Sequence, residues 1–203
     1  MDKPGAFESS GLRLEAVISR SDTGRAAVIT HPHPLYGGDM DNPVVLALAE
    51  AYRRQGWSVL RFNFRGTGNS EGQYSGGRGE VEDVQAAVGH LRAMGHKKIH
   101  LAGYSFGAWV NSLWACQYQD HSVDQVMVSP PVAFLSFDRV TGLAGLKLVI
   151  TGSRDEIAPA GQILKMAPRW NPEADLVIME EADHFYAGFR QHIIQVVGRW
   201  LGG

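Results

Sequence analysis

Several features that would assign this chain to a special class of protein are scarce or missing. Its single cysteine, Cys116, excludes an intrachain disulfide. No apolar run is long enough to span a membrane, and residues 1–5 do not begin a signal peptide, so we expect a cytoplasmic protein without membrane association. A formal net charge of −2 offers nothing that would attract nucleic acid.

Short apolar runs alternate with helical patterns along the 203 residues, a length that suits one domain, 1–203, with a sizeable core. The apolar runs predict strands at 12–18, which reads as an edge strand, and at 26–30, 57–62, 99–102, 126–128, 146–150 and 176–179. Apolar periodicity predicts helices at 43–55, 81–91, 108–115, 163–167 and 189–200. This alternation predicts an α/β fold, with a mostly parallel central sheet flanked by helices on both faces.

The most informative segment is the Gly-Tyr-Ser-Phe-Gly sequence at 103–107. It lies between a predicted strand and a predicted helix, where a sharp turn would expose the hydroxyl of Ser105 and direct free helix N–H groups towards its target. Gly-x-Ser-x-Gly alone is also compatible with an ordinary loop serine. A catalytic interpretation therefore needs a base, an acid and an oxyanion donor from elsewhere in the chain.

Two further residues follow predicted strands, as catalytic residues of a parallel sheet should. Asp155 comes after the strand at 146–150, and His184 comes after the strand at 176–179. Ser105, Asp155 and His184 stand in the chain order of an α/β-hydrolase triad of nucleophile, acid and base. Asp183 is a rival acid, but adjacent residues seldom direct their side chains at one another, so we favour Asp155.

The His-Pro-His-Pro-Leu-Tyr-Gly-Gly segment at 31–38 follows an early strand, where such an enzyme needs a second oxyanion donor besides the N–H of Phe106. The prolines have no N–H, which leaves His33, Leu35 and Tyr36 as candidates, and we favour His33. We expect His31 to form hydrogen bonds that hold the loop rigid. Two histidines alone make a poor metal site, and we predict neither a metal nor an organic cofactor.

The glycine-rich segment at 61–72 matches neither a dinucleotide fingerprint nor a phosphate-binding loop. We interpret it as a structural loop that braces the site, with Arg65 paired to Asp83 or Glu80.

These motifs together resemble the small, lidless bacterial α/β-hydrolase family. The resemblance is carried by 31–38, Arg-Phe-Asn-Phe-Arg-Gly at 61–66, Gly-Glu at 79–80, 103–107 and Asp-His-Phe at 183–185. More distantly, the pattern is similar to dienelactone hydrolases and serine peptidase-like hydrolases. The resemblance implies an α/β-hydrolase fold with Ser105 as nucleophile, Asp155 as acid and His184 as base.

The segment at 129–138 leads to the next strand within a short span, which leaves no room for a cap domain. We therefore expect an open, apolar cleft, suited to acyl groups of modest size. Its expected substrate-binding walls are Leu35, Tyr36, Phe134, Phe137 and Tyr186, beside Phe106.

The sequence thus predicts a serine hydrolase that cleaves a small carboxylic ester or thioester through an acyl-enzyme on Ser105. A peptidase or amidase with the same three residues is one alternative. A non-catalytic binding module on a hydrolase scaffold is another, because fold does not fix function. We expect a monomer or a small homo-oligomer.

Overall fold

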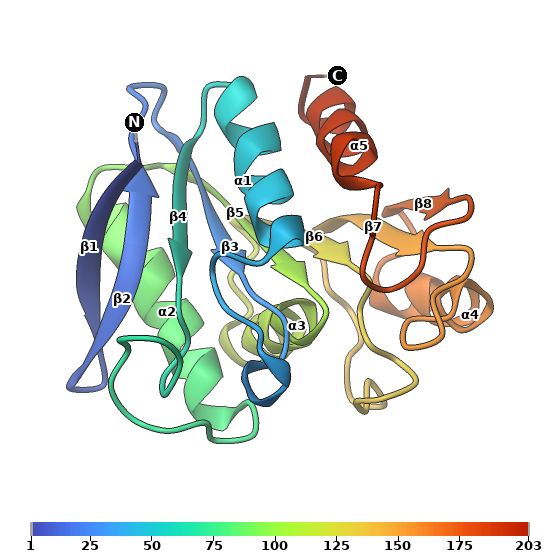
Figure 1. Cartoon of the computed structure of the whole chain (residues 1–203), viewed down its shortest axis with the longest axis horizontal. Helices are drawn as coiled ribbons and strands as arrows, with labels where there is room; N and C mark the ends of the chain where they lie inside the picture. The colour runs from blue at the N-terminus through green and yellow to red at the C-terminus, as the bar shows by residue number, and fades with distance from the viewer. Residues whose placement is uncertain (1, 203) are drawn as a thin grey trace.

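One eight-stranded sheet runs through the centre of the computed structural model, which describes residues 2–202 (Figure 1). Its order is β1-β2-β4-β3-β5-β6-β7-β8. The six strands from β4 across to β8 are parallel, whereas β1 and β2 are antiparallel to their neighbours at one edge. The strands are β1 (Asp2–Ser9), β2 (Leu12–Ser19), β3 (Arg25–Thr30), β4 (Ser58–Phe62), β5 (Lys98–Tyr104), β6 (Val123–Val128), β7 (Leu146–Gly152) and β8 (Asp175–Met179).

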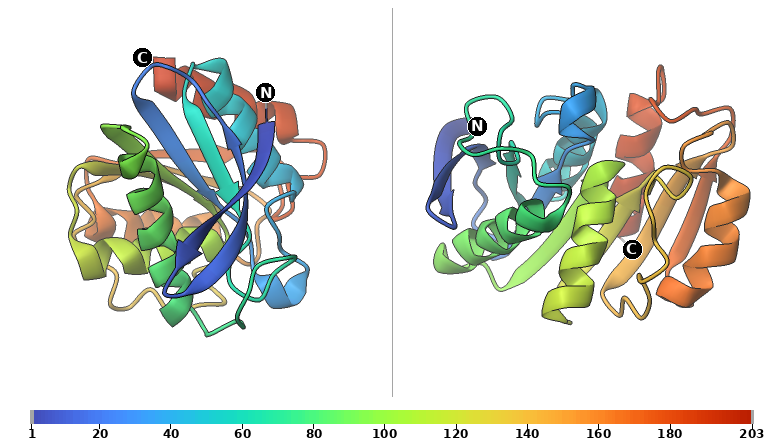
Figure 2. Two further views of the ribbon diagram at one scale, coloured as in Figure 1. Left: turned by 90° about the vertical axis from the view of Figure 1, so that its left-hand side faces the viewer. Right: turned by 90° about the horizontal axis from the view of Figure 1, so that it is seen from below.

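Helices cover both faces of this sheet (Figure 2). The helices are α1 (Pro43–Arg54), α2 (Arg78–Ala93), α3 (Phe106–Tyr118), α4 (Ala160–Trp170) and α5 (Arg190–Gly202), with a short 3-10 helix, η1 (Pro34–Tyr36). Helices α1 and α5 pack together on one face, and α2, α3 and α4 line the other. This is the α/β-hydrolase fold, as predicted.

Helix α1 shows how local sequence sets an element that frames the site. Asn42 caps it by accepting the Val44 N–H at 2.9 Å, and Pro43 occupies the first turn, where its missing N–H costs nothing. Its apolar stripe, which includes Leu48 and Tyr52, is fully buried against the sheet and α5. The capped end of α1 therefore lies fixed beside the loop that carries η1.

Each predicted strand and helix is present, but β1 was not predicted. Pro4 and Gly5 interrupt its pattern, and only Phe7 and Ser9 in this strand are buried, so its sequence has no clear strand period. Pairing with β2 creates the strand. As a result, the prediction that 12–18 is an edge strand is wrong, because β1 lies outside it.

No cap covers the carboxyl edge of the sheet in the described part of the chain. The connection from β6 to β7, residues 129–145, contains turns and no helix. The fold is therefore lidless, as predicted. Within 2–202, no helix has both the length and the apolar character needed to cross a bilayer.

Candidate active site

Ser105 occupies the turn between β5 and α3 in a backbone conformation that side chains rarely adopt, with φ 53° and ψ −117°. The neighbouring glycines permit the turn. A Cβ on Gly103 would lie 2.5 Å from the Ala108 nitrogen, and one on Gly107 would lie 2.6 Å from the Thr30 carbonyl carbon. The strand–turn–helix context demanded by the Gly-x-Ser-x-Gly sequence is therefore present.

The structure brings together three side chains that are far apart in the sequence. His184 Nε2 lies 2.9 Å from Ser105 Oγ, and His184 Nδ1 lies 2.9 and 3.0 Å from the two oxygens of Asp155. An ionised carboxylate only accepts hydrogen bonds, so Nδ1 carries the hydrogen and Nε2 is left to accept the serine proton. The rival Asp183 instead accepts the N–H groups of Phe185 and Tyr186 within its own turn.

The carboxylate of Asp155 is buried, and several donors form hydrogen bonds to it. It accepts hydrogen bonds from the N–H groups of Ile157 and Ala158, at 2.9 and 2.7 Å, and from the hydroxyl of Ser129, at 2.6 Å. Burial opposes its ionisation, but these bonds and the one from His184 outweigh burial and hold the pKa of Asp155 below its ordinary value. Asp155 is therefore ionised at neutral pH.

Ser129 and Tyr186 extend this network behind Asp155, and the sequence contains no local signal for this role. Ser129 follows β6 with φ 46°, and its hydroxyl also lies 2.8 Å from the hydroxyl of Tyr186. Because the Ser129 hydrogen is directed at Asp155, Tyr186 is the donor to Ser129 Oγ. Tyr104 similarly donates to the carbonyl oxygen of His184 at 2.7 Å. Burial raises the pKa of both tyrosines, so both remain donors.

Three of the predicted cleft walls are wrong. Tyr186 is buried in the network just described and does not line the cleft. Phe137 is 2% exposed and packs on Trp170 of α4, with ring centroids 5.2 Å apart, so it belongs to the core. Leu35 is exposed on η1 but lies outside the cavity lining.

The cavity in front of Ser105 has a volume of about 560 Å³. Tyr36 and Phe134 line it, as predicted, and Phe185, which was not predicted as a wall, lines it as well. The other lining residues are Pro32, His33, Gly37, Gly38, Asn42, Tyr104, Ser105, Ile157 and His184.

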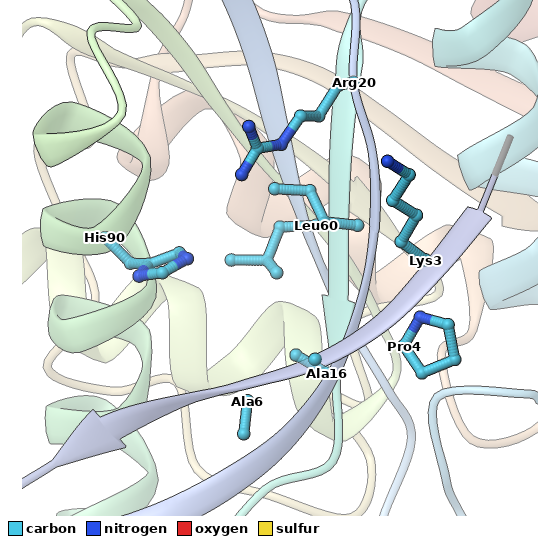
Figure 3. A pocket seen from close by; sticks show the side chains of 9 residues that line it. Lys3, Pro4, Ala6, Ala16, Arg20, Leu60 and His90 are labelled. Atoms are coloured by element: carbon cyan, nitrogen blue, oxygen red, sulfur yellow. The ribbon is translucent and has the colours of Figure 1, made fainter.

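A separate cavity of about 380 Å³ lies between β1, β2 and β4 and the end of α2, lined by residues that include Arg20, Leu60 and His90 (Figure 3). Its lining holds no hydroxyl, thiol or carboxylate side chain. The candidate active site is therefore the cavity at Ser105.

The structure favours His33 among the three candidates for the second oxyanion donor. The N–H of Leu35 donates to His33 Nδ1 at 3.3 Å, and the N–H of Tyr36 donates to the His33 carbonyl at 3.1 Å. The N–H of His33 has no acceptor within the described residues. The N–H of Phe106, at the first position of α3, has no intrahelical acceptor either.

His31 holds this loop in place, as expected. Its Nε2 accepts the Phe64 N–H at 3.0 Å, so its Nδ1 carries the hydrogen and donates to the Pro32 carbonyl at 2.7 Å. Burial lowers the pKa of His31 to about 4, which keeps the ring neutral. A side chain on Gly38 would collide with the Pro32 carbonyl, so the loop closes tightly at both ends.

The 61–72 segment is a structural loop held by contacts to α2 and β1, also as expected. The guanidinium of Arg65 contacts the buried carboxylate of Asp83 at 2.8 Å, and Ser9 donates to the same carboxylate at 2.7 Å. Of the two acids considered for Arg65, Asp83 is the partner. Glu80 instead accepts the N–H groups of Ser75 and Gly77 at the start of α2, each at 2.8 Å.

Comparison with known proteins agrees with this architecture. The sequence matches the family model described as alpha/beta hydrolase family over residues 31–200. The match covers most of the chain, and the protein belongs to the alpha/beta hydrolase family.

Individual relatives and solved structures are similar to this chain over most of its length. An uncharacterized protein of Rickettsia prowazekii is 31% identical over 201 residues, which cover 93% of this chain and 84% of that protein. An alpha-beta serine hydrolase homologue from Coxiella burnetii superposes with a TM-score of 0.91 at 33% identity, over 98% of this chain and 97% of that one. A serine hydrolase without a lid from Xanthomonas campestris has a TM-score of 0.86 at 29% identity, over 100% of this chain and 96% of that one.

Proposed function

We propose that this hydrolase cleaves a carboxylic ester or thioester through an acyl-enzyme on Ser105. The observation that carries the proposal is the continuous set of hydrogen bonds from Ser105 through His184 to Asp155, at the floor of an open cavity. A serine hydroxyl is a weak nucleophile by itself. Here it has a base at hydrogen-bond distance, and the base has a carboxylate that fixes its tautomer.

In the first half of the reaction, Ser105 Oγ attacks the substrate carbonyl while its proton moves to His184 Nε2. The negative charge that develops on the carbonyl oxygen is stabilised by the N–H groups of Phe106 and His33, for which residues 2–202 provide no other acceptor. When the tetrahedral intermediate collapses, the bond to the leaving oxygen or sulfur breaks. The proton on His184 then passes to that atom, and the acyl group stays on Ser105.

In the second half, water takes the place of the leaving group. It gives a proton to His184 and attacks the acyl carbon. The intermediate releases the carboxylic acid and returns the proton to Ser105 Oγ. Asp155 stays ionised throughout and stabilises the imidazolium in both halves, consistent with its lowered pKa.

Replacement of the nucleophile tests this proposal. We expect Ser105→Ala to abolish hydrolysis of 4-nitrophenyl acetate and labelling by a fluorophosphonate probe, with unchanged circular dichroism. Wild-type rates in the variant would refute the role of Ser105. Failure of the wild-type protein to react with either reagent would favour a binding module. Parallel rates on matched esters, thioesters and amides would distinguish an esterase from a peptidase.

A further inference from the structure

Large apolar side chains are exposed in this cavity. Three that line it are aromatic and largely exposed: Tyr36 at 74%, Phe134 at 54% and Phe185 at 70%. Exposed apolar groups gathered at one concave place mark a surface that is covered when a ligand binds.

Two of the aromatic rings form a corner, one from η1 in the 31–38 loop and one from the β6–β7 connection. Tyr36 and Phe134 meet edge to face, with centroids 5.8 Å apart and an interplanar angle of 69°. Both rings also pack on the ring of His33, at 4.8 and 6.3 Å. The corner therefore adjoins the residue whose free N–H would bind the carbonyl oxygen.

The third ring stands beside the base. Phe185 packs edge to face on His184, with centroids 5.8 Å apart and an interplanar angle of 88°. The atom that leaves the substrate must lie at His184 Nε2 to receive its proton. A group attached to that atom consequently lies next to Phe185, whereas the group on the acyl carbon remains near His33.

The charge around the cavity restricts the ligand as well. Its lining contains no lysine or arginine. The residues that directly adjoin the lining in sequence include four carboxylates and no lysine or arginine. Asp41 is paired with Arg61, whereas Asp39, Glu156 and Asp183 have no lysine or arginine partner among the described residues. An anionic substrate would meet repulsion from these three carboxylates.

From these observations we propose that the substrate is an uncharged ester of an acid that carries an aromatic ring. Tyr36 and Phe134 hold that ring as an acyl subsite, and Phe185 contacts the leaving group as a separate subsite. The ring corner offers edge-to-face contacts that a saturated ring of similar size cannot make. This inference rests on the proposed acyl-enzyme at Ser105.

Matched pairs of esters test the acyl subsite. The 4-nitrophenyl esters of 3-phenylpropanoic and 3-cyclohexylpropanoic acid share a leaving group and differ only in ring type. We expect the wild type to prefer the phenyl ester in kcat/KM by about 3- to 10-fold, the range expected for one aromatic contact. Tyr36→Leu and Phe134→Leu should each bring this ratio towards one, whereas Leu35→Ala, on the same 3-10 helix but outside the cavity, should leave it unchanged.

A second pair tests the leaving-group subsite. Benzyl acetate and cyclohexylmethyl acetate share an acyl group and have chemically similar leaving alcohols. Phe185→Leu should lower the preference for benzyl acetate and leave the phenylpropanoate ratio unchanged. Tyr36→Leu and Phe134→Leu should do the reverse.

The outcomes separate this inference from the proposed function. Equal rates on both members of each pair, or variants that change both ratios equally, would overturn the subsite assignment while ester hydrolysis and fluorophosphonate labelling remain. A greater kcat/KM for a coenzyme A thioester than for the uncharged thioester of the same acid would overturn the charge argument. Loss of all hydrolysis and labelling in the wild type would instead refute the acyl-enzyme itself.

Discussion

Two buried histidines in this molecule each lie beside an aspartate, yet only one of them can act as a base. His184 bridges Asp155 and the hydroxyl of Ser105 at the floor of an open cavity. His100, in β5, has Asp124 at 3.3 Å from Nε2 and the hydroxyl of Tyr52 at 3.1 Å from Nδ1.

The surroundings of His100 suppress its basicity. Its ring packs against Trp57, with centroids 4.2 Å apart, and near Trp200. Burial, reinforced by the positive charges of Lys98 and Arg25, lowers the pKa of His100 to about 3. A histidine next to a carboxylate is therefore not sufficient for catalysis. It also needs a nucleophile at its second nitrogen and space for a substrate, and His184 has both because Ser105 lines the cavity.

The largest expected contrast comes from replacing each histidine in turn. His184→Gln should lower kcat/KM on 4-nitrophenyl esters by about 10³-fold or more, because Ser105 loses its base. His100→Gln should leave kcat/KM within about twofold and lower the Tm, because a packed aromatic contact is lost. Steady-state kinetics and thermal unfolding check both variants. A comparable loss of activity in the two would remove the distinction between the sites.

A smaller loss of activity is expected from replacing Ser129, which lies behind Asp155. Ser129→Ala removes a hydrogen bond to the carboxylate, and we expect kcat to fall about 10-fold while fluorophosphonate still labels Ser105. Loss of this donor raises the pKa of Asp155, so the acid limb of the activity profile should move to higher pH.

The matched control is Ser136→Ala, whose exposed hydroxyl contacts Asp138 at 2.9 Å and is remote from this network. Its pH profile should be that of the wild type. An unshifted acid limb in Ser129→Ala would show that Ser129 has only a packing role.

A further effect leaves activity aside and concerns stability in acid. The pKa of His100 falls from 6.5 in the unfolded chain to about 3 on folding, so the unfolded state binds the proton first. This contribution to stability is complete above pH 6.5 and is lost as the pH falls towards 3. Over that window the free energy of unfolding should decline by up to about 1.4 kcal/mol per pH unit for this residue.

Denaturant unfolding at pH 7, 6, 5 and 4 measures this slope. His100→Gln should flatten it, whatever its effect on absolute stability, whereas replacement of the exposed His121 by glutamine should not. Parallel slopes for wild type and His100→Gln would contradict the assignment of a buried, neutral ring.

Comparison of sequence and structure shows which features have local signals. Ser105, Asp155 and His184 could be selected because each follows a parallel strand, and the carboxyl ends of such strands meet at one edge. The loop at 31–38 could be expected beside the site because it follows an early strand, and its prolines, which have no N–H, leave few candidates for the oxyanion donor.

Other features depend on contacts that no local pattern encodes. Phe137 and Tyr186 look like wall residues in the sequence, but packing places Phe137 against Trp170 and Tyr186 against Ser129. The hydroxyl of Ser129 acquires its role only when β6 and β7 bring it to Asp155. Strand β1 likewise exists because of its partner and not because of its own propensity.

Direct observation of the covalent intermediate tests whether Ser105, activated by His184 and Asp155, is the nucleophile. The wild-type protein is mixed with 4-nitrophenyl 3-phenylpropanoate, quenched in acid within the first turnover and analysed by mass spectrometry of its peptides. We expect one phenylpropanoyl group on the peptide that contains Ser105, decaying as the carboxylic acid appears. A burst of 4-nitrophenol with no adduct on that peptide, or an adduct on another residue, would contradict the assignment of Ser105 as the nucleophile.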